Sequence, residues 1–364
     1  MDYVRGHFLQ VRPPPADELD TPGMKIGIAF DLKPLAPIPG NGPDDTYEEY
    51  DSPATIDFLA DAIRSLGHEA IPMGNGAELL KALLASPPDL VFNIAEGSGV
   101  SRNREARVPA VCEMLGIPCT GSDPLTLAVA LDKDITRRLV DCDEVHLPAG
   151  ILLERPPHYE DDGRYDEFPA MIAESGLKLP LIAKPVCEGS SKGIRNRSLI
   201  ETPEAFGPMV VELWNAYRQP VLVEEFIAGD EVTVGILGND PPEVLGVMRV
   251  VPKVPTDRFV YSLEVKRNYE ALVDYECPPK LRGSVLRDLE QSALAAYEAI
   301  GCRDVARLDY RIRDGVPYFI EVNPLPGLNP ISGDLVLIAN AMGVTHAELV
   351  QRIFDAACIR MGVK

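Results

Sequence analysis

The sequence predicts an α/β protein in which an N-terminal parallel α/β unit precedes two α+β units. In the first third of the chain, apolar strand patterns alternate with amphipathic helix patterns, an order typical of a parallel sheet. From residue 123 this alternation is lost, and the pattern changes again at Asp230. The length of 364 residues allows two or three domains at roughly 100–200 residues each.

The N-terminal unit is expected over residues 24–122, after a poorly ordered, proline-containing extension at residues 1–23. Apolar spacing predicts a helix over residues 54–66, and Gly67 suits its C-terminal end. The other elements expected in this unit are strands at residues 24–30, 69–72 and 89–94 and helices at residues 78–84 and 105–115.

A central unit is expected over residues 123–228 and a C-terminal unit over residues 229–364. One helix, capped by Ser122 or Asp123, is predicted to run to about Val140. The further predicted strands are 181–186, 194–198, 221–227, 231–237, 244–251, 305–312 and 316–323, and the further helices are 202–217, 281–300 and 345–359. Residues 155–167 are predicted to form a surface insertion, and residues 252–279 a long irregular segment.

Composition excludes several classes of protein. The formal net charge is −21, with 35 Lys and Arg against 56 Asp and Glu, which argues against nucleic acid as a partner. No apolar run approaches the ~20 residues that span a bilayer, so no membrane partner is expected. Seven scattered cysteines without a CxxC pair, and five histidines far apart, predict reduced thiols and no zinc site. A cytoplasmic location is therefore expected.

Two neighbouring strand patterns carry polar residues that suit a divalent cation. Arg307 and Asp309 lie two residues apart, as do Glu321 and Asn323, so each pair shares one face of its strand. A three-residue turn would place all four on one face with Arg307 opposite Glu321, whereas a two-residue turn would separate the pairs. Two carboxylates and an amide oxygen suit Mg²⁺. A surface ion pair between Arg307 and Glu321 is the alternative.

A glycine-flanked loop at residues 189–193 suits phosphate binding. The loop follows the strand that carries Lys184, contains Lys192, and can bring backbone N–H groups against phosphate oxygens. An ordinary hairpin turn is an equal alternative. The loop also fits the G-x-S-x-G pattern of hydrolases, but a strand is predicted to follow it and only His346 lies downstream. The GxxxxGK[ST] pattern is absent.

Acidic residues close a further predicted strand, where Glu224, Glu225 and Glu231 flank Phe226 and Ile227. A strand edge with an apolar side chain can hold a purine, and a nearby carboxylate can bind ribose hydroxyls. Acidic strand ends are also common on solvated surfaces, so this segment alone indicates little.

In combination and in this order, these motifs resemble the ATP-grasp superfamily and, within it, the D-alanine–D-alanine ligase family. The resemblance covers about residues 24–361. Its markers are Pro118-Cys119-Thr120-Gly121-Ser122, Leu131-Asp132-Lys133, Lys184-Pro185, Glu188-Gly189-Ser190-Ser191, Glu224 to Glu231, Arg307-Leu308-Asp309 and Glu321-Val322-Asn323-Pro324-Leu325-Pro326-Gly327. The implied fold has three domains, the last two being the α+β domains of an ATP-grasp fold with ATP between them.

The resemblance also implies a role for individual residues. The implied ATP-binding residues are Lys133, Lys184, Glu188, Ser191, Lys192, Glu224, Glu225, Phe226, Ile227, Glu231 and Ile320. The implied ligands of two Mg²⁺ ions, for which Mn²⁺ is an alternative, are Asp309, Glu321 and Asn323. The implied catalytic residues are Arg307, which would stabilise a tetrahedral oxyanion, and Ser190. The implied substrate-binding residues are Glu49, Lys266, Arg267, Gly327 and Ser332.

The implied activity is that of a ligase that uses ATP to activate a carboxylate as an acyl phosphate and joins it to an amine. The product is then a dipeptide or a related amide, with ADP and phosphate released. The expected partners are a small-molecule carboxylate and amine, and a homodimer is compatible with the sequence. The alternatives are a kinase-like phosphotransferase and a non-catalytic nucleotide-binding regulator, although a regulator has no need of the oxyanion group Arg307.

The sequence departs from the family pattern around the amino-acid pockets. The usual His-Gly-x-x-Gly-Glu-Asp-Gly signature is missing, and residues 93–97 and 103–105 read NIAEG and NRE instead. Arg267 stands beside Lys266 where the ligases commonly have tyrosine, and Glu225 stands where lysine is common. Glu48 or Glu49 is nearest to the glutamate that grips the amine of the first D-alanine. A product other than D-alanyl-D-alanine is therefore expected.

Overall fold

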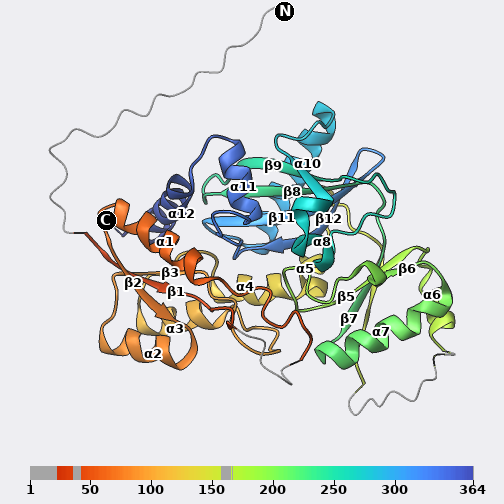
Figure 1. Ribbon diagram of the computed structural model, residues 1–364, viewed down its shortest axis with the longest axis horizontal. Helices are drawn as coiled ribbons and strands as arrows, with labels where there is room; N and C mark the ends of the chain where they lie inside the picture. The colour runs from red at the N-terminus through yellow and green to blue at the C-terminus, as the bar shows by residue number, and fades with distance from the viewer. Residues whose placement is uncertain (1–22, 36–41, 157–164, 166, 364) are drawn as a thin grey trace, which may run out of the picture.

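The computed structural model describes residues 23–35, 42–156, 165 and 167–363, which form three sheets with helices packed around them (Figure 1). The N-terminal sheet has β1 (Lys25–Ala29) at its centre, between β2 (Glu69–Gly74) and β3 (Leu90–Asn93), with both neighbours parallel to it. Its helices are α1 (Pro53–Ser65), α2 (Gly76–Ala85) and α3 (Arg107–Leu115). The predicted parallel α/β unit is confirmed.

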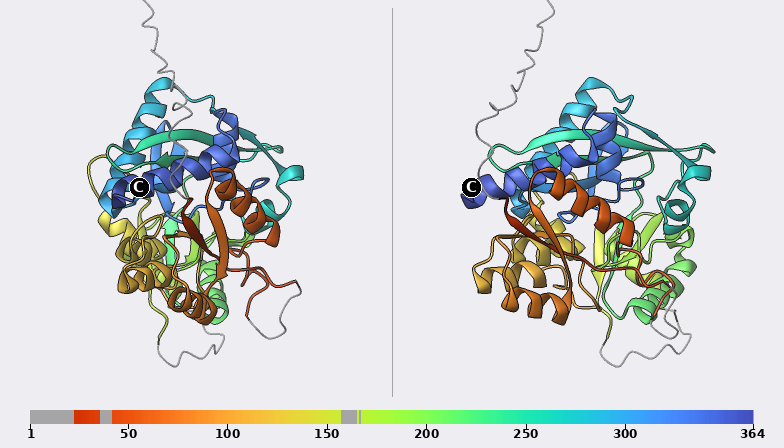
Figure 2. Two further views of the ribbon diagram at one scale, coloured as in Figure 1. Left: turned by 90° about the vertical axis from the view of Figure 1, so that its left-hand side faces the viewer. Right: turned by 60° about the vertical axis from the view of Figure 1, so that its left-hand side comes forward.

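Helix α1 joins this unit to the end of the chain. Ser52 caps α1 by accepting a hydrogen bond from the Thr55 amide. The buried face of α1, with Leu59 and Ile63, shares one core with Val350 and Phe354 of α12 (His346–Met361). The two helices lie side by side in both views of Figure 2, and their apolar contact stabilises the N-terminal unit against the C-terminal one.

The central sheet is antiparallel and has the order β4 (Gly150–Leu153), β7 (Val221–Glu225), β5 (Leu181–Pro185) and β6 (Leu199–Ile200). Two helices cover it, α6 (Phe168–Ser175) and α7 (Pro203–Tyr217). The strand predicted at residues 194–198 is wrong. A single turn of 3₁₀ helix occupies Asn196–Ser198, where the Ser198 side chain accepts a hydrogen bond from the Arg195 amide, and pairing begins only at Leu199.

The helix predicted from Pro124 to Val140 is two helices, α4 (Pro124–Leu131) and α5 (Lys133–Leu139). Asp132 breaks the run because its backbone is extended and its side chain accepts a hydrogen bond from the Ile135 amide, as an N-cap residue does. The Lys133 amide donates instead to the Val186 carbonyl at the end of β5. The break therefore fixes Lys133 beside the central sheet.

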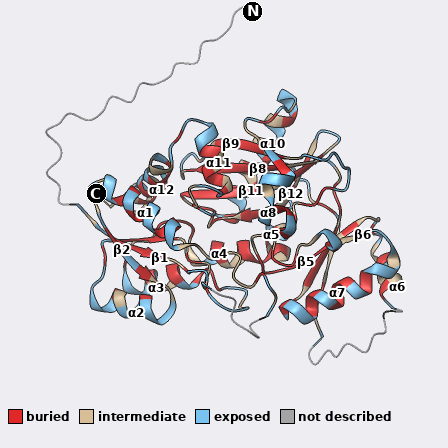
Figure 3. Cartoon of the chain, viewed as in Figure 1, coloured by how far each residue is buried: buried red, intermediate tan, exposed pale blue. Residues whose placement is uncertain are grey.

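The C-terminal sheet is also antiparallel, in the order β10 (Val273–Glu276), β9 (Glu243–Pro252), β8 (Asp230–Leu237), β11 (Val305–Arg313) and β12 (Val316–Asn323). Helix α10 (Gly283–Ile300) packs on one face, and α11 (Asp334–Ala341) packs against β8 and β9. On β11, Leu308, Tyr310 and Ile312 enter the core under α10. Because side chains alternate across a strand, the odd-numbered residues of β11 face the other way. Figure 3 shows the strands of this sheet largely buried.

The segment between β9 and α10 is more ordered than the irregular stretch predicted for residues 252–279. It contains the short helices α8 (Leu263–Arg267) and α9 (Tyr269–Leu272) and then β10. Ser262 starts α8 by accepting a hydrogen bond from the Val265 amide. Val265 and Val273 share a small apolar core with Phe259 and Val250 of β9, so local packing and capping order a segment that was predicted to be irregular.

Other expectations concern the whole chain. The predicted extension at residues 1–23 and insertion at residues 155–167 fall mostly outside the described residues. In the part of the chain that is described, no helix is both long and apolar enough to cross a membrane. All seven cysteines are free thiols.

Candidate active site

The β11–β12 hairpin places the predicted metal ligands on one face by a register that neither of the two turn lengths considered gives alone. The turn has two residues, Asp314 and Gly315, both left-handed, and Arg313 pairs with Val316. A two-residue turn alone would put Arg307 and Asp309 on one face of the hairpin and Glu321 and Asn323 on the other. A bulge on β12 at Ile320 corrects this, so that Asp309 lies opposite Glu321 rather than Ile320.

The face of β11 that points away from α10 carries a hydrogen-bonded polar row, which is largely buried. The Arg307 guanidinium donates two hydrogen bonds to Asp309, at 3.1 and 2.8 Å, and lies 3.3 Å from a carboxylate oxygen of Asp334. Asp309 also accepts from Thr233 of β8 at 2.5 Å and from the Asn323 amide at 3.2 Å. Arg307 and Asp309 are therefore held in fixed orientations.

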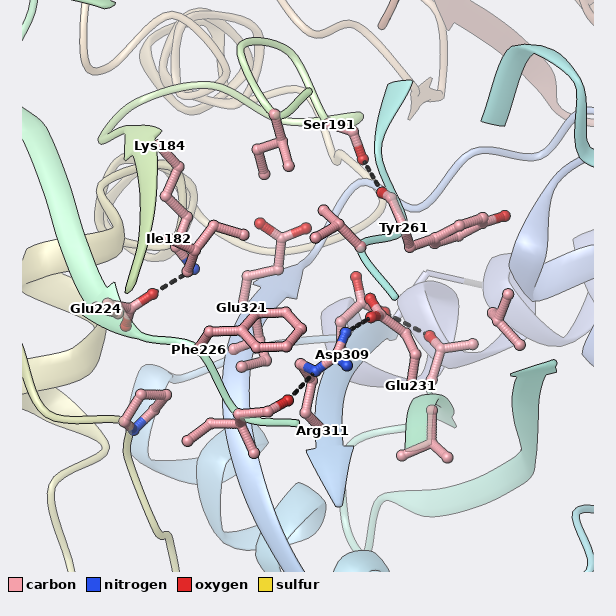
Figure 4. A pocket seen from close by; sticks show the side chains of 18 of the residues that line it. Ile182, Lys184, Ser191, Glu224, Phe226, Glu231, Tyr261, Asp309, Arg311 and Glu321 are labelled. Carbon is pink, nitrogen blue, oxygen red and sulfur yellow. Dashed lines mark hydrogen bonds and ion pairs between the residues drawn. The ribbon is translucent and has the colours of Figure 1, made fainter. Parts of the chain in front are cut away.

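A cavity opens between this face and the central sheet, and we call it the inter-sheet cavity (Figure 4). It combines apolar side chains with charged ones at the ends of β5, β7, β8, β11 and β12. Its lining residues are Pro148, Ile182, Lys184, Ser191, Ile194, Glu224, Glu225, Phe226, Ile227, Glu231, Val232, Thr233, Val250, Val260, Tyr261, Lys266, Arg307, Asp309, Arg311, Ile320, Glu321 and Asp334.

Lys184 and Glu224 form an ion pair inside this cavity, pointing toward each other from adjacent strands (Figure 4). Both are almost fully buried, at 3% and 1% exposure. Arg137 of α5 pairs with the other oxygen of Glu224 and donates to the Pro148 carbonyl at 2.6 Å. The pairing orients the Lys184 amine in a water-poor space. Burial lowers the pKa of Lys184 to about 7, while the negative charge of Glu224 favours the ammonium form, and in such a space that charge acts strongly on an anion.

The other end of the cavity has an apolar wall and a carboxylate. The Arg311 guanidinium lies 4.7 Å from the centre of the Phe226 ring and donates to the Ile227 carbonyl and to Glu231. Burial raises the pKa of Glu231, against the opposing effect of Arg311. A flat apolar ring beside backbone polar groups suits a planar heterocycle, and the nearby carboxylate suits hydroxyl groups.

The loop at residues 188–193 and the 259–266 segment close over the cavity together. Ser190 and Ser191 both have left-handed backbones, with φ of 49° and 59°, which is uncommon for residues other than glycine. The Ser191 hydroxyl donates to the Tyr261 carbonyl at 3.0 Å, and the Leu263 amide donates to the Ile194 carbonyl at 3.0 Å. The loop is thus not an ordinary hairpin turn but part of a cover over the cavity.

A second cavity, which we call the junction pocket, lies where the N-terminal, central and C-terminal units meet. Its lining residues are Glu49, Glu96, Glu105, Ala130, Leu131, Lys133, Glu188, Gly189, Ser190, Arg307, Glu321, Val322, Asn323, Pro324, Leu325 and Gly327. Arg307 and Glu321 line both cavities, so the two cavities meet at these side chains.

Lys133 and Glu321 form an ion pair of 3.2 Å at this shared boundary. Lys133 also donates to the Glu188 carbonyl. Burial opposes ionisation of Glu321, but the ammonium groups of Lys133 and Lys184 lower its pKa to about 2. Glu321 is therefore a carboxylate, able to bind a cation, throughout the physiological pH range.

The wall of the junction pocket rests on a buried charge network. Both carboxylate oxygens of Glu49 accept from one Arg104 nitrogen at 3.0 Å, and Glu49 also accepts from Lys192 at 3.1 Å and from the Gly189 amide at 2.6 Å. Arg104 and Lys192 also contact Glu188, whose second oxygen accepts from Gln219 at 2.8 Å. Although burial opposes it, these cations lower the pKa of Glu49. The network joins the segment at residues 42–52 to the loop at residues 188–193.

Glu49→Gln is expected to lower the free energy of unfolding by about 3 kcal/mol, because removing one partner leaves buried cations without compensation. The matched control is Glu48→Gln. Glu48 is the neighbouring residue, but the side chains of its partners Lys33 and Arg267 are 50% and 38% exposed. Loss of the Glu48 charge is therefore expected to lower the free energy of unfolding by less than about 1 kcal/mol. Denaturant unfolding of both variants measures this, and equal losses would contradict the assigned roles.

Two of the predicted substrate residues lie outside both cavities. Arg267 pairs with Asp44 at 2.8 Å and with Glu48 at 2.9 Å, so it ties α8 to the N-terminal unit. Ser332 is exposed, and its hydroxyl donates to Asn329 at 3.2 Å. The remaining site residues predicted from the sequence line one cavity or the other, apart from Lys192, whose ammonium group contacts the junction-pocket residues Glu49 and Glu188.

Some cavity residues were missed by the sequence analysis. Arg311 continues the two-residue spacing of Arg307 and Asp309, a signal that would have found it. Asp334, at the start of α11, and Thr233 on β8 reach the site only through tertiary packing. Arg104, Glu96 and Glu105 carry no spacing pattern that separates them from surface charges.

The donor set at the hairpin fits a hard cation without forming a complete cage. Within the described ranges, no group of three or more His, Cys, Asp and Glu side chains is placed to hold a metal. Asp309, Glu321 and Asn323 supply two carboxylates and an amide oxygen. Mg²⁺ is commonly bound by one or two carboxylates with phosphate and water oxygens completing the shell, so these residues fit the ion when a nucleotide is present.

Comparisons with known proteins agree with this geometry. Residues 159–355 match the family model for the D-ala D-ala ligase C-terminus. A D-alanine–D-alanine ligase of Geobacter sulfurreducens is 31% identical over 302 residues, which cover 82% of this chain and 87% of that protein. An uncharacterised protein of Sinorhizobium fredii, y4sG, is 32% identical over 315 residues, covering 83% of this chain and 86% of its own length.

Solved structures show the same fold. A D-alanine–D-alanine ligase of Bacillus anthracis in complex with ATP superposes with a TM-score of 0.68 at 20% identity, covering 94% of this chain and 98% of that one. The VanG D-Ala:D-Ser ligase of Enterococcus faecalis gives a TM-score of 0.66 at 21% identity, with coverage of 92% and 99%.

The two facing antiparallel sheets and the cavity between them define an ATP-dependent ligase of the ATP-grasp type, a C–N bond-forming enzyme that acts on small molecules. More narrowly, the family model and the relatives show that the chain belongs to the D-alanine–D-alanine ligase family.

Proposed function

We propose that this enzyme binds ATP with Mg²⁺ in the inter-sheet cavity, phosphorylates a carboxylate in the junction pocket, and joins the resulting acyl phosphate to an amine. The observation that carries the proposal is that Arg307 and Glu321 line both cavities. A phosphoryl group at this boundary would meet a carboxylate held in the junction pocket. The proposed units are residues 24–122, 123–228 and 229–364.

Within the inter-sheet cavity, the apolar wall of Phe226, Ile227 and Ile320 would hold the adenine base. Glu231 would accept hydrogen bonds from the ribose hydroxyls. Lys184 lies deeper in the cavity, where its ammonium group would contact the phosphates. Glu224, which is already paired with Lys184 and Arg137, would position that lysine more than it would contact the base.

The chemical difficulty is that a carboxylate must approach a phosphate of like charge. Lys133 and Lys184 would reduce this repulsion, because both lie near Glu321 and an approaching anion favours the charged form of each lysine. Asp309, Glu321 and Asn323 would hold Mg²⁺, which neutralises charge on the phosphate oxygens when bound. Arg307, fixed by Asp309 and Asp334, would stabilise the oxyanion that forms when the amine attacks the acyl carbon.

The acyl phosphate would be hydrolysed if water reached it. The Ser191–Tyr261 and Ile194–Leu263 hydrogen bonds hold the cover closed across the cavity. Arg267 adds a tie from the same cover to Asp44 and Glu48. Exclusion of water by this cover therefore serves the reaction.

The test is ADP release from the full chain with MgATP and pairs of small carboxylates and amines. A ligase releases ADP only when an acid and an amine are both present, and it releases one phosphate for each ADP. ADP formation with an acid alone, accompanied by a stable phosphorylated product, would support a kinase-like enzyme instead. Nucleotide binding without turnover for any pair would support a regulator.

A further inference from the structure

A groove on the C-terminal unit shares no lining residue with either cavity of the active site, and we call it the α12 groove. The turn between β8 and β9 forms one side of it, and the C-terminal half of α12 forms the other. Leu245 and Val344 line the groove and are buried, whereas Met342 and Ile359 line it and are 48% and 82% exposed. Exposed apolar side chains that gather in one place are typical of a surface that binds another segment of chain.

The β8–β9 side of the α12 groove is acidic. The charged residues that line the groove are Asp240, Glu243, Asp355, Arg352 and Arg360. Asp240 and Glu243 are exposed and make no ion pair with any described residue. Arg360 is held by the buried carboxylate of Asp304, through two hydrogen bonds of 2.9 and 2.8 Å, so its charge is already compensated. An occupant that combines apolar side chains with positive charge would therefore complement the groove.

The described chain begins close to one wall of this groove. The Met24 amide donates to a ring nitrogen of His68 at 3.2 Å, and the His68 ring lies 4.9 Å from the Phe354 ring of α12. The next residue of α12, Asp355, lines the groove. Figure 1 shows the start of β1 near the C-terminal end of α12. Residues 1–22, which lie outside the described residues, therefore join the described chain beside the groove.

The first residues of the chain have the composition that such an occupant needs. Residues 3–12 read YVRGHFLQVR, with five apolar side chains and two arginines. The ten residues 13–22, which read PPPADELDTP, separate this segment from Gly23. A proline-rich stretch of that length can span roughly 30 Å, at about 3.1 Å per residue. Residues 3–12 can therefore reach the α12 groove, where Arg5 and Arg12 carry the charge opposite to that of its acidic side.

We propose that residues 3–12 bind in the α12 groove of the same chain, with their apolar side chains against Met342 and Ile359 and their arginines beside Asp240 and Glu243. The bound segment covers apolar surface that is otherwise exposed to water. Because α12 also packs against α1, the segment adds to the contact between the C-terminal and N-terminal units.

The first test compares backbone hydrogen exchange of the full chain with that of the double variant Phe8→Asp/Leu9→Asp. Exchange in residues 238–245 and 352–361 is expected to be at least about threefold faster in the double variant, because the segment no longer covers them. The matched control is Leu19→Asp, which changes an apolar residue of the same N-terminal stretch outside residues 3–12. It should exchange as the wild type does. Equal exchange of the two segments in the wild type and the double variant would overturn the proposal.

The second test changes the groove and follows the N-terminal segment. Trypsin cleaves after Arg5, and mass spectrometry gives the rate of this cut in the full chain. Ile359→Asp is expected to make the cut at least about threefold faster, because it places a charge where apolar side chains bind. Met114→Asp is the matched control, since Met114 is 85% exposed on α3, outside the groove. A wild-type cleavage rate in Ile359→Asp would contradict the proposed contact.

The same assay distinguishes the chain's own segment from a second copy of the protein. A cleavage rate at Arg5 that does not change with protein concentration supports binding within one chain. A rate that falls as the protein concentration rises would place a second copy in the groove and overturn the proposal. The rate of ADP release is expected to be unchanged in Ile359→Asp, because the α12 groove and the active site share no residue. Failure of this inference therefore leaves the proposed ligase reaction intact.

Discussion

Asp309→Asn and Glu321→Gln are each expected to lower the rate of ADP release by about 10²–10³-fold, the usual cost of removing one electrostatic group that stabilises a transition state. Both substitutions keep the shape of the side chain and remove its negative charge. Hard cations need that charge. Asp309 and Glu321 face each other across the hairpin, so either loss would disturb the same metal site. ADP release at saturating MgATP measures the effect.

Asp314→Asn is the matched control, because Asp314 lies exposed in the turn of the same hairpin and asparagine tolerates its left-handed backbone. It should retain wild-type activity. Circular dichroism of all three variants should show the folded chain. A wild-type rate for Asp309→Asn or Glu321→Gln at ordinary Mg²⁺ concentration would remove these residues from the metal site.

Lys184→Met is expected to weaken MgATP binding by roughly 10–100-fold, the equivalent of losing one charge-assisted hydrogen bond worth about 1.5–3 kcal/mol. Methionine preserves the apolar stem, which is 97% buried with the rest of the side chain, and removes the ammonium group. Glu224 would keep Arg137 as a partner, which limits the loss of stability. Calorimetric titration with MgATP gives the affinity.

The control for this variant is Lys178→Met, which removes an exposed lysine just before β5. Its affinity for MgATP should equal that of the wild type, as should its Tm. An unchanged affinity in Lys184→Met would show that the buried ammonium group serves the sheet alone and does not contact phosphate.

The sequence predicted the architecture well where the signal was local. Strand and helix alternation predicted the parallel N-terminal sheet, and the spacing of Arg307 with Asp309 placed both on one face. The hairpin register was wrong in detail. The turn has two residues, and the bulge at Ile320 restores the common face. No residue type in the bulge distinguishes it from regular strand, so only pairing with β11 reveals it.

The sequence also predicted one helix from Pro124 to Val140 where the structure has two, α4 and α5. Asp132 has a capping side chain, but apolar spacing on both sides of it favoured one continuous helix. The deciding contact is the bond from the Lys133 amide to Val186, a residue more than fifty positions away.

The junction pocket was the part of the site that could be predicted least from the sequence. Glu49, Arg104 and Glu188 come from three separate segments and form one network only after folding. The same holds for Glu96 and Glu105, which loop packing at Gly97 brings together. Charged residues in loops are usually solvated, so nothing in the sequence sets these two apart as lining residues of the pocket.

The central claim is that a carboxylate is activated by phosphorylation before it meets the amine. Its most direct test uses an acid labelled with ¹⁸O in its carboxylate, supplied with MgATP and an amine that supports turnover. Through an acyl phosphate, one labelled oxygen should appear in inorganic phosphate for each amide formed. Amide formation with unlabelled phosphate would show that no acyl phosphate forms and would contradict the account.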